Sequence, residues 1–141
     1  MNSYMYKDLY VGMKEKFEVK ISETMLDSFR NITGDVNPLH NDISYAKSSG
    51  FDKRVAFGML TASFLSTLAG VYLPGKYSYI QEVTTKFVKP VFPGDLLEVI
   101  GEVIELDDCV QRFVMKVEIK NQEGNKVLRG QMKVGVINAG K

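Results

Sequence analysis

The sequence predicts an α+β protein in which an antiparallel β-sheet wraps around a long central α-helix. The first observation is the absence of charged side chains between Arg54 and Lys76, which a helix buried on most sides would explain. The second is a series of four strand-like segments after Pro74-Gly75, with no helical pattern between them. Helices and strands are thus segregated along the chain, which favours helices on one face of an antiparallel sheet.

Length and composition predict one globular domain over residues 1–141. Hydrophobic residues make up 45% and charged residues 25% of the chain, which is typical of soluble proteins. The formal net charge of +1 indicates no nucleic-acid-binding surface. The single cysteine, Cys109, excludes an internal disulfide and is typical of a reducing compartment. Since the opening MNSYMYKDLYVG lacks the pattern of a secretory signal, we expect a cytoplasmic protein.

The first third of the chain predicts a strand and then a helix. Phe17, Val19 and Ile21 alternate with charged residues, as in a half-buried strand. Ser22 is a suitable N-cap, and the helix should end near Thr33-Gly34 because glycine commonly follows the last helical turn. Its apolar stripe consists of Met25, Leu26, Phe29 and Ile32.

A polar loop, a short helical turn and the long apolar helix come next. The turn is predicted from Asp42 to Ser48, with Gly50 closing it. The uncharged run would then form about 18 residues of helix, nearly 30 Å long. Its length is also that of a membrane span, but hydroxyl side chains lie along it and no basic cluster favours one side. We therefore expect a buried helix and no membrane segment.

The four strands are predicted over residues 77–88, 96–106, 110–121 and 126–137. Met115, Val117 and Ile119 alternate with charged residues, so they should face the core. The stretch QEGN, residues 122–125, predicts the hairpin loop between the last two strands. The stretch PVFPGD, residues 90–95, predicts a turn between the first two.

Several blocks resemble the MaoC-like hydratases, which are (R)-specific enoyl-CoA hydratases and 3-hydroxyacyl-thioester dehydratases of the hot-dog fold. The blocks are TGDVNPLHND, RVAFGMLTASFLSTLAG, LPG and FVKPVFPGD, and the resemblance runs from about Phe17 onward. It implies a hydro-lyase that acts on an acyl thioester of CoA or acyl carrier protein, and we expect no cofactor. It also implies a homodimer or a dimer-based higher oligomer.

The resemblance also implies the site residues. Asp35 and His40 would be the catalytic pair, and the Gly58 N–H would polarise the thioester carbonyl. A serine of the central helix would lie near them, with Ser66 the better match and Ser63 the alternative. We further place Asn37, Phe57 and Met59 beside the substrate.

One position departs from the family pattern. The family often has His-Gly-Met where this chain has Phe57-Gly58-Met59. A phenylalanine has no hydrogen-bonding group, so a contact made by the family's imidazole at this position would be absent. Because the catalytic histidine is the one in the loop, we expect an altered acyl-chain preference with the chemistry retained.

The predicted chemistry is the addition of water to a 2-enoyl thioester. Water must lose a proton as its oxygen attacks C3, C2 must gain a proton, and the enolate oxygen must be stabilised. A carboxylate and an imidazole could hold one water for the two proton transfers. Pro38 would stiffen the backbone between Asp35 and His40, and Asn37 could cap the turn.

Alternative interpretations remain open at this stage. His40 could be a surface residue, Asp35 a turn former, and the helix hydroxyls could bond to carbonyls of their own helix. Asp35, His40 and Asp42 offer one nitrogen ligand and no further cluster, so a metal site is not expected. A hot-dog thioesterase and a non-catalytic acyl-CoA-binding protein are the competing functions.

Overall fold

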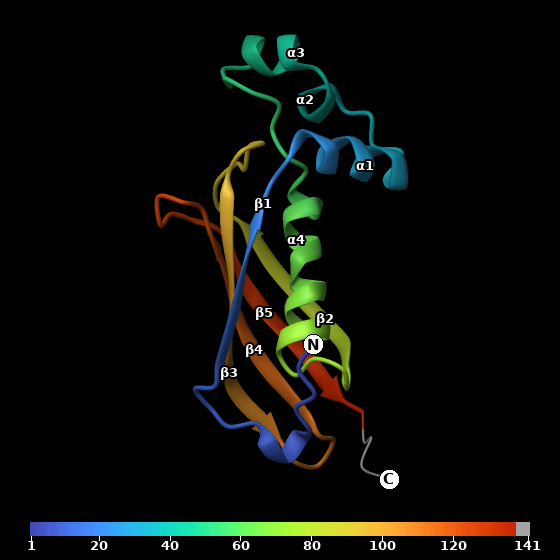
Figure 1. Ribbon diagram of the computed structural model, residues 1–141, viewed down its shortest axis with the longest axis vertical. Coiled ribbons are helices and arrows are strands. Elements are labelled where there is room, and N and C mark those ends of the chain that lie inside the picture. The colour runs from blue at the N-terminus through green and yellow to red at the C-terminus, as the bar shows by residue number, and fades with distance from the viewer. Residues whose placement is uncertain (138–141) are drawn as a thin grey trace.

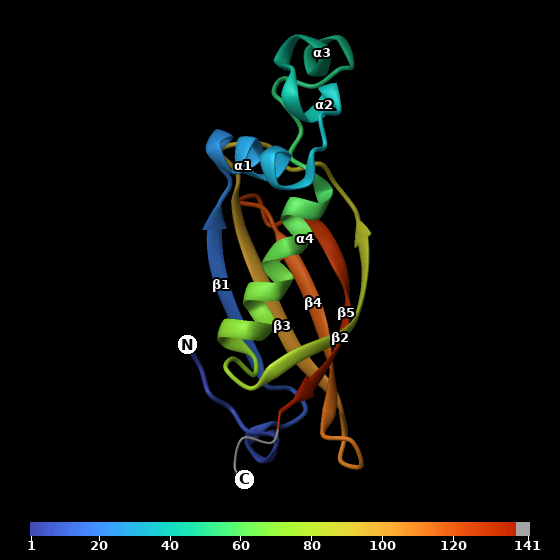
Figure 2. The ribbon, with the colours of Figure 1, turned by 90° about the vertical axis from the view of Figure 1, so that its right-hand side faces the viewer.

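A curved, five-stranded antiparallel sheet packs around one helix in the computed structural model, which describes residues 1–137 (Figures 1 and 2). The spatial order of the strands is β1-β3-β4-β5-β2, so β1 and β2 form the two edges. The strands are β1 (Lys14–Lys20), β2 (Ser78–Phe87), β3 (Leu96–Asp107), β4 (Arg112–Lys120) and β5 (Lys126–Val136). The predicted strands and their antiparallel arrangement are confirmed. The single domain over residues 1–141 remains a prediction, because residues 138–141 lie outside the described part.

The strand faces follow the alternation of the sequence. Met115, Val117 and Ile119 of β4 are fully buried against the helix, as predicted. Asn121–Asn125 form the loop between β4 and β5, where the Gly124 N–H donates to the Asn121 carbonyl. The charged residues between the buried ones point to the outer face, where Glu118 pairs with Lys116 and Lys126. Burial raises the pKa of the Glu118 carboxyl, but the hydrogen bonds and charges of the two lysines outweigh burial and lower this pKa below its usual value.

The first helix begins and ends where the sequence predicts. It is α1 (Glu23–Thr33), and the Ser22 Oγ accepts a hydrogen bond from the Met25 N–H at 3.2 Å. Gly34 ends the helix with a φ of 74°, a left-handed conformation that glycine adopts at low cost. The predicted apolar stripe is wrong at its last member. Leu26 is buried, but Ile32 is 81% exposed because the final turn extends past the sheet.

The predicted polar loop contains a short helix, α2 (Pro38–Asn41). Pro38 occupies the first turn, where its missing N–H costs nothing, and the Asn37 side chain accepts from the Leu39 N–H at 3.0 Å. Asp42 then caps α3 (Ile43–Ser48), the helical turn that the sequence predicts. Helices α1, α2 and α3 gather beyond one end of the sheet (Figures 1 and 2).

The central helix is shorter than predicted. It comprises α4 (Gly58–Thr67) and continues directly into a π-helical segment, η2 (Leu68–Tyr72). Before Gly58 the chain is extended, because the Val55 N–H donates to the Leu39 carbonyl and the Ala56 N–H to the Val91 carbonyl. These two bonds hold the chain away from helical geometry until Gly58.

Close packing holds the central helix against the sheet. Leu65 and Leu68 are buried among core side chains of β3, β4 and β5. Gly101 of β3 permits this approach, since a Cβ there would lie 3.0 Å from Leu68 Cδ2 and 2.5 Å from Met115 Sδ. The opposite side of α4 is uncovered, and Met59, Ser63 and Ser66 are exposed there. In the described part of the chain, no helix is long and apolar enough to cross a bilayer.

Candidate active site

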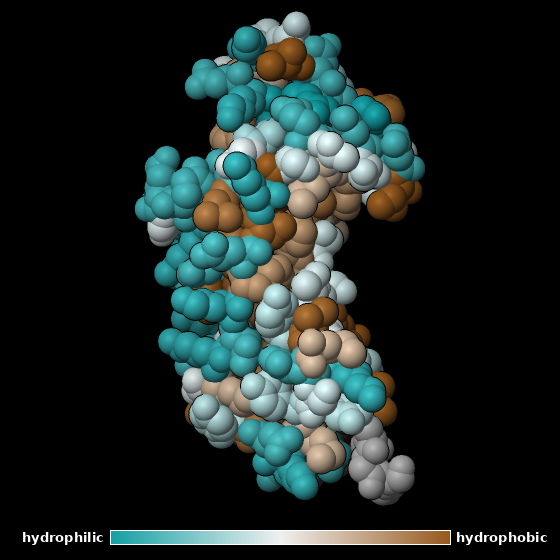
Figure 3. Space-filling model, viewed as in Figure 1, coloured by the Kyte–Doolittle hydropathy of each residue, from teal (hydrophilic) through white to brown (hydrophobic). Residues whose placement is uncertain are grey.

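Five of the seven predicted site residues lie around one cavity at the amino end of α4. This cavity, which we call the Asp35 cavity, has a volume of about 470 Å³. Its walls include Asp35, His40, Phe57, Gly58, Met59 and Phe87. The surface is hollowed beside α4, below the overhanging helix α1 (Figure 3). Two side chains from one loop and the first residue of the central helix thus face a common space.

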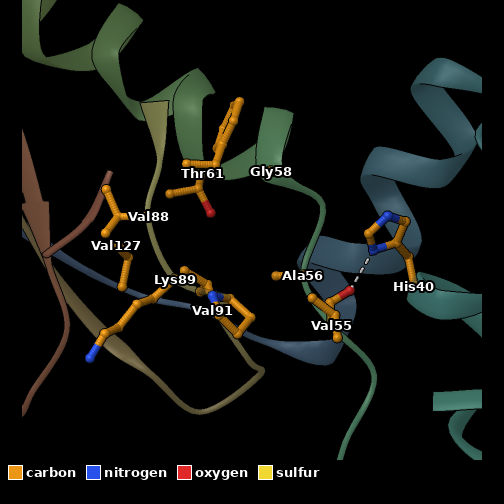
Figure 4. Close-up of a pocket in the computed structure, with 11 residues that line it drawn as sticks. His40, Val55, Ala56, Gly58, Thr61, Val88, Lys89, Val91 and Val127 are labelled. Carbon is orange, nitrogen blue, oxygen red and sulfur yellow. Dashed lines mark hydrogen bonds between the residues drawn. The ribbon is translucent and has the colours of Figure 1, made fainter. Parts of the chain in front are cut away.

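The backbone fixes the tautomer of the His40 ring. His40 Nδ1 lies 2.6 Å from the Val55 carbonyl oxygen (Figure 4). A carbonyl oxygen only accepts hydrogen bonds, so Nδ1 carries the hydrogen and donates it. In the neutral ring the lone pair is therefore on Nε2, which points away from Val55 (Figure 4). His40 thus offers Nε2 as its proton-transfer atom.

Phe57 supports the imidazole from one side. Its ring centroid is 4.3 Å from that of His40, with an angle of 31° between the planes. The Phe57 side chain is 2% exposed and also packs on Phe29, at 5.0 Å between centroids. The residue that departs from the family pattern therefore restricts how the His40 ring can tilt.

A local hydrogen-bond network holds the loop that carries Asp35. The Asp35 Oδ1 accepts from the Asn37 N–H at 3.1 Å. The Asn41 side chain donates to the backbone carbonyls of Asp35, at 3.2 Å, and of Asn37, at 2.8 Å. Asn41 is not among the site residues predicted from the sequence, although asparagine in a turn commonly bonds to nearby backbone. Asp35 thus projects from a segment that α2 fixes in place.

Gly58 is the first residue of α4, so its N–H has no acceptor within the helix. The partial positive charge of the helix amino end adds to the attraction for an oxyanion. A Cβ on Gly58 would lie 3.1 Å from Cε1 of Phe87, closer than most side chains approach each other. Glycine therefore keeps this wall of the Asp35 cavity open to a ligand.

Arg54 joins α1 to the loop of His40, and the sequence analysis missed this role. Its guanidinium donates to the carboxylates of Glu23 and Asp27, the latter at 3.0 Å, and its Nη1 is 3.4 Å from the His40 carbonyl oxygen. Burial lowers the pKa of Arg54, but these hydrogen bonds and the two carboxylate charges outweigh burial and raise the pKa above its usual range. The guanidinium stays charged and joins the first half of α1 to the His40 carbonyl of α2.

Arg54→Met should lower the free energy of unfolding by about 1–2 kcal/mol, because it removes a largely buried guanidinium with two carboxylate partners. Arg30→Met is the matched control, since Arg30 forms one ion pair with Asp27 at 3.5 Å. Its expected loss is within about 0.5 kcal/mol. Urea denaturation of both variants measures the difference. Equal losses of unfolding free energy in the two variants would show that the Arg54 contacts stabilise the fold no more than the single ion pair of Arg30.

The remaining predicted site residues divide into two groups. Phe57 and Met59 line the Asp35 cavity, and Met59 is 65% exposed at its rim. Asn37 caps α2 and does not line the cavity. Ser66 is exposed about two turns along α4, outside the cavity wall, and the Ser63 hydroxyl donates to the Leu60 carbonyl at 2.6 Å. Substrate contacts by Asn37 and Ser66 remain predictions.

Asp35 and His40 are side chains of the types that commonly transfer protons. Within residues 1–137, no three side chains of the His, Cys, Asp and Glu types gather as metal ligands would. Asp35 and His40 are one carboxylate and one imidazole beside an open cavity that Gly58 also lines.

Two enzymes of known function are similar to this chain in sequence. A 3-hydroxybutyryl-CoA dehydratase of Methylorubrum extorquens is 39% identical over 72% of this chain, and the match spans 64% of that enzyme. An (R)-specific enoyl-CoA hydratase of Aeromonas caviae is 31% identical, covering 89% of this chain and 93% of the hydratase.

The three-dimensional comparison gives the same result. The unliganded R-hydratase PhaJ1 of Pseudomonas aeruginosa superposes with a TM-score of 0.90 at 34% identity, covering 94% of this chain and 85% of that one. The hot-dog fold implied by the sequence blocks is therefore confirmed. The model of the MaoC-like domain family matches residues 10–125, and the chain belongs to this family.

Proposed function

We propose that the protein catalyses the (R)-specific addition of water to 2-enoyl-CoA thioesters and the reverse dehydration of (R)-3-hydroxyacyl thioesters. The observation that carries the proposal is the common cavity of Asp35, His40 and Gly58. The names of the relatives support it, because they are hydratases and dehydratases of this substrate class.

In this proposal Asp35 and His40 hold one water molecule beside C3 of the substrate. As the water oxygen bonds to C3, the pair takes one water proton, with Nε2 of His40 free to accept it because Nδ1 is bound to Val55. The electrons of the double bond move onto the thioester oxygen and form an enolate. A proton from the pair then bonds to C2 as the enolate collapses, so that one water has been added and the side chains are restored.

Gly58 would stabilise the enolate. Its N–H lies where α4 begins, so a thioester oxygen there meets an unpaired donor and the helix dipole together. A donor of this kind acts mainly on the charge that develops in the transition state. It therefore raises the rate of the chemical step more than it raises substrate affinity.

The test is the ultraviolet absorbance of crotonyl-CoA, which falls when water adds to the double bond. We expect the absorbance to fall with purified protein, and chiral analysis to identify (R)-3-hydroxybutyryl-CoA. Release of free CoA thiol without a hydrated product would instead assign the protein to the thioesterases. Binding without either reaction would leave an acyl-CoA-binding protein.

We also propose a homodimer that forms through β2. This strand is an edge of the sheet, and an exposed edge offers unpaired N–H and C=O groups to a partner strand. Four of its apolar side chains are exposed: Tyr79, Ile80, Val83 and Phe87. The exposed side of α4 lies beside it, so one partner could cover both. A cytoplasmic location remains a prediction from composition.

Val83→Lys should convert the dimer to a monomer, because a charged side chain on an edge strand opposes pairing. Light scattering after size-exclusion chromatography measures the mass. Ile104→Lys is the control, since Ile104 is an exposed apolar residue of the interior strand β3 and its variant should stay dimeric. A wild-type protein with the mass of one chain would contradict the proposed dimer.

A further inference from the structure

A second cavity adjoins the candidate active site. It has a volume of about 280 Å³, and we call it the Thr61 cavity. It shares His40, Gly58 and Phe87 with the Asp35 cavity, so the two spaces meet at the amino end of α4. Its other walls are mostly aliphatic, including Ala56, Val88 and Val91 (Figure 4). A chain bound at Gly58 could therefore continue into this cavity.

Thr61 places a hydroxyl group in these aliphatic surroundings. The residue is 2% exposed, and its Oγ1 has no hydrogen-bond partner among the residues that the structure describes. In Figure 4 this oxygen points from α4 into the cavity. A buried hydroxyl without a partner is unfavourable, and folded proteins rarely leave one unsatisfied. Valine has nearly the same shape and would avoid that cost, so the hydroxyl indicates a polar occupant.

The spacing from Gly58 defines where such an occupant would lie. Thr61 is three residues after Gly58, so the two are neighbours on one side of the helix, about 5–6 Å apart. An extended chain advances about 5 Å over four bonds. A thioester whose oxygen accepts from the Gly58 N–H would thus bring an atom four bonds from its carbonyl carbon near Thr61.

We propose that the Thr61 cavity is a subsite for a hydrogen-bonding group of the bound thioester and that the Thr61 hydroxyl binds this group. The inference rests on the proposed function for the orientation of the ligand. In this proposal Thr61 is a specificity-determining residue, because its hydroxyl group can bind a polar group and the aliphatic residues around it cannot.

Two parts of an acyl thioester carry such a group at this distance. In the pantetheine arm, the first amide nitrogen is four bonds from the carbonyl carbon, through sulfur and two methylene carbons. In the acyl chain, an oxygen on C4 is also four bonds away. The shared chemistry is a neutral oxygen- or nitrogen-containing group in an aliphatic channel, and experiment distinguishes the two sources.

The experiment measures dissociation constants of saturated thioesters, which have no double bond to hydrate. For the thiol arm, butanoyl N-acetylcysteamine thioester is compared with butanoyl 4-methylpentyl thioester, in which carbon replaces the amide. For the acyl arm, 4-oxopentanoyl-CoA is compared with 4-methylpentanoyl-CoA. Each pair is titrated by NMR against wild type, Thr61→Val and Thr61→Ser. Thr67→Val is the control, because Thr67 lies on the same helix but outside the cavity wall.

We expect wild type to prefer the polar member of one pair, and Thr61→Val to reduce that preference by about fivefold to tenfold, as for one hydrogen bond. Thr61→Ser keeps the hydroxyl and should retain the preference, as should Thr67→Val. If Thr61→Val changes the preference only in the thiol pair, the group bound by Thr61 is the pantetheine amide. If it changes the preference only in the acyl pair, the bound group is a polar substituent of the acyl chain. Equal preferences in wild type and Thr61→Val for both pairs would overturn the proposal, since the hydroxyl would then bind only water or its own helix.

This outcome is separate from that of the proposed reaction. A Thr61-dependent preference without hydration of crotonyl-CoA would reject the lyase and retain the subsite. Hydration with preferences that do not depend on Thr61 would reject the subsite and retain the lyase.

Discussion

Asp35→Asn and His40→Asn should each lower kcat/KM for hydration of crotonyl-CoA by about 10²–10⁴-fold, the usual contribution of a positioned acid or base. Asparagine at position 35 can still accept from the Asn37 N–H, and asparagine at position 40 can still donate to the Val55 carbonyl, because its Nδ2 takes the place of Nδ1. The substitutions therefore remove proton transfer while keeping the contacts that hold the loop. Initial rates of absorbance loss measure the effect.

The double variant should be little slower than the slower single variant, because the two side chains would act on the same water. Asp42→Asn is the matched control. It changes a carboxylate in the same segment, but Asp42 lies outside both cavity walls and asparagine is an equally good cap for α3. Wild-type rates for Asp35→Asn or His40→Asn would remove that residue from the mechanism.

Gly58→Pro should lower kcat by about 10²–10³-fold, because it deletes the N–H that would bind the enolate oxygen. Proline suits the first position of a helix. The preceding residue, Phe57, has φ −59° and ψ 129°, which a following proline also favours. The backbone should therefore tolerate the substitution.

Gly58→Ala is the control that distinguishes loss of the N–H donor from loss of the space that glycine leaves open. It adds a Cβ near Phe87, as proline does, but keeps the N–H. The ratio of the two variants' kcat values isolates the hydrogen bond, and circular dichroism checks that both fold. If the alanine and proline variants were equally slow, crowding would explain the loss and the proposed oxyanion contact would be wrong.

The sequence predicts the elements of this fold well, because most of them are set by local patterns. Period-2 alternation gives the strands, and Ser22 and Gly34 bound α1 through contacts within a few residues. The start of α4 could not be read in this way, since hydrogen bonds to Leu39 and Val91, distant in sequence, hold the preceding residues extended.

Contacts distant in sequence also make part of the candidate site unpredictable from local patterns. The motif identifies Asp35, His40 and Gly58, and the structure places all three around one cavity. The contacts of Arg54 span 31 residues to Glu23 and 14 to His40, and no local pattern indicates them. The missing partner of the Thr61 hydroxyl likewise depends on walls contributed by the segment around residues 88–91. Such features arise only when distant segments come together.

The packing of His40 against Phe57 makes the candidate site directly observable by spectroscopy. His40 is the only histidine in the chain, so its imidazole proton resonances need no assignment by mutagenesis. A phenylalanine ring at a centroid distance of 4.3 Å shifts those resonances through its ring current. One-dimensional proton spectra therefore follow ring orientation, titration and ligand arrival at one known position in an unlabelled sample.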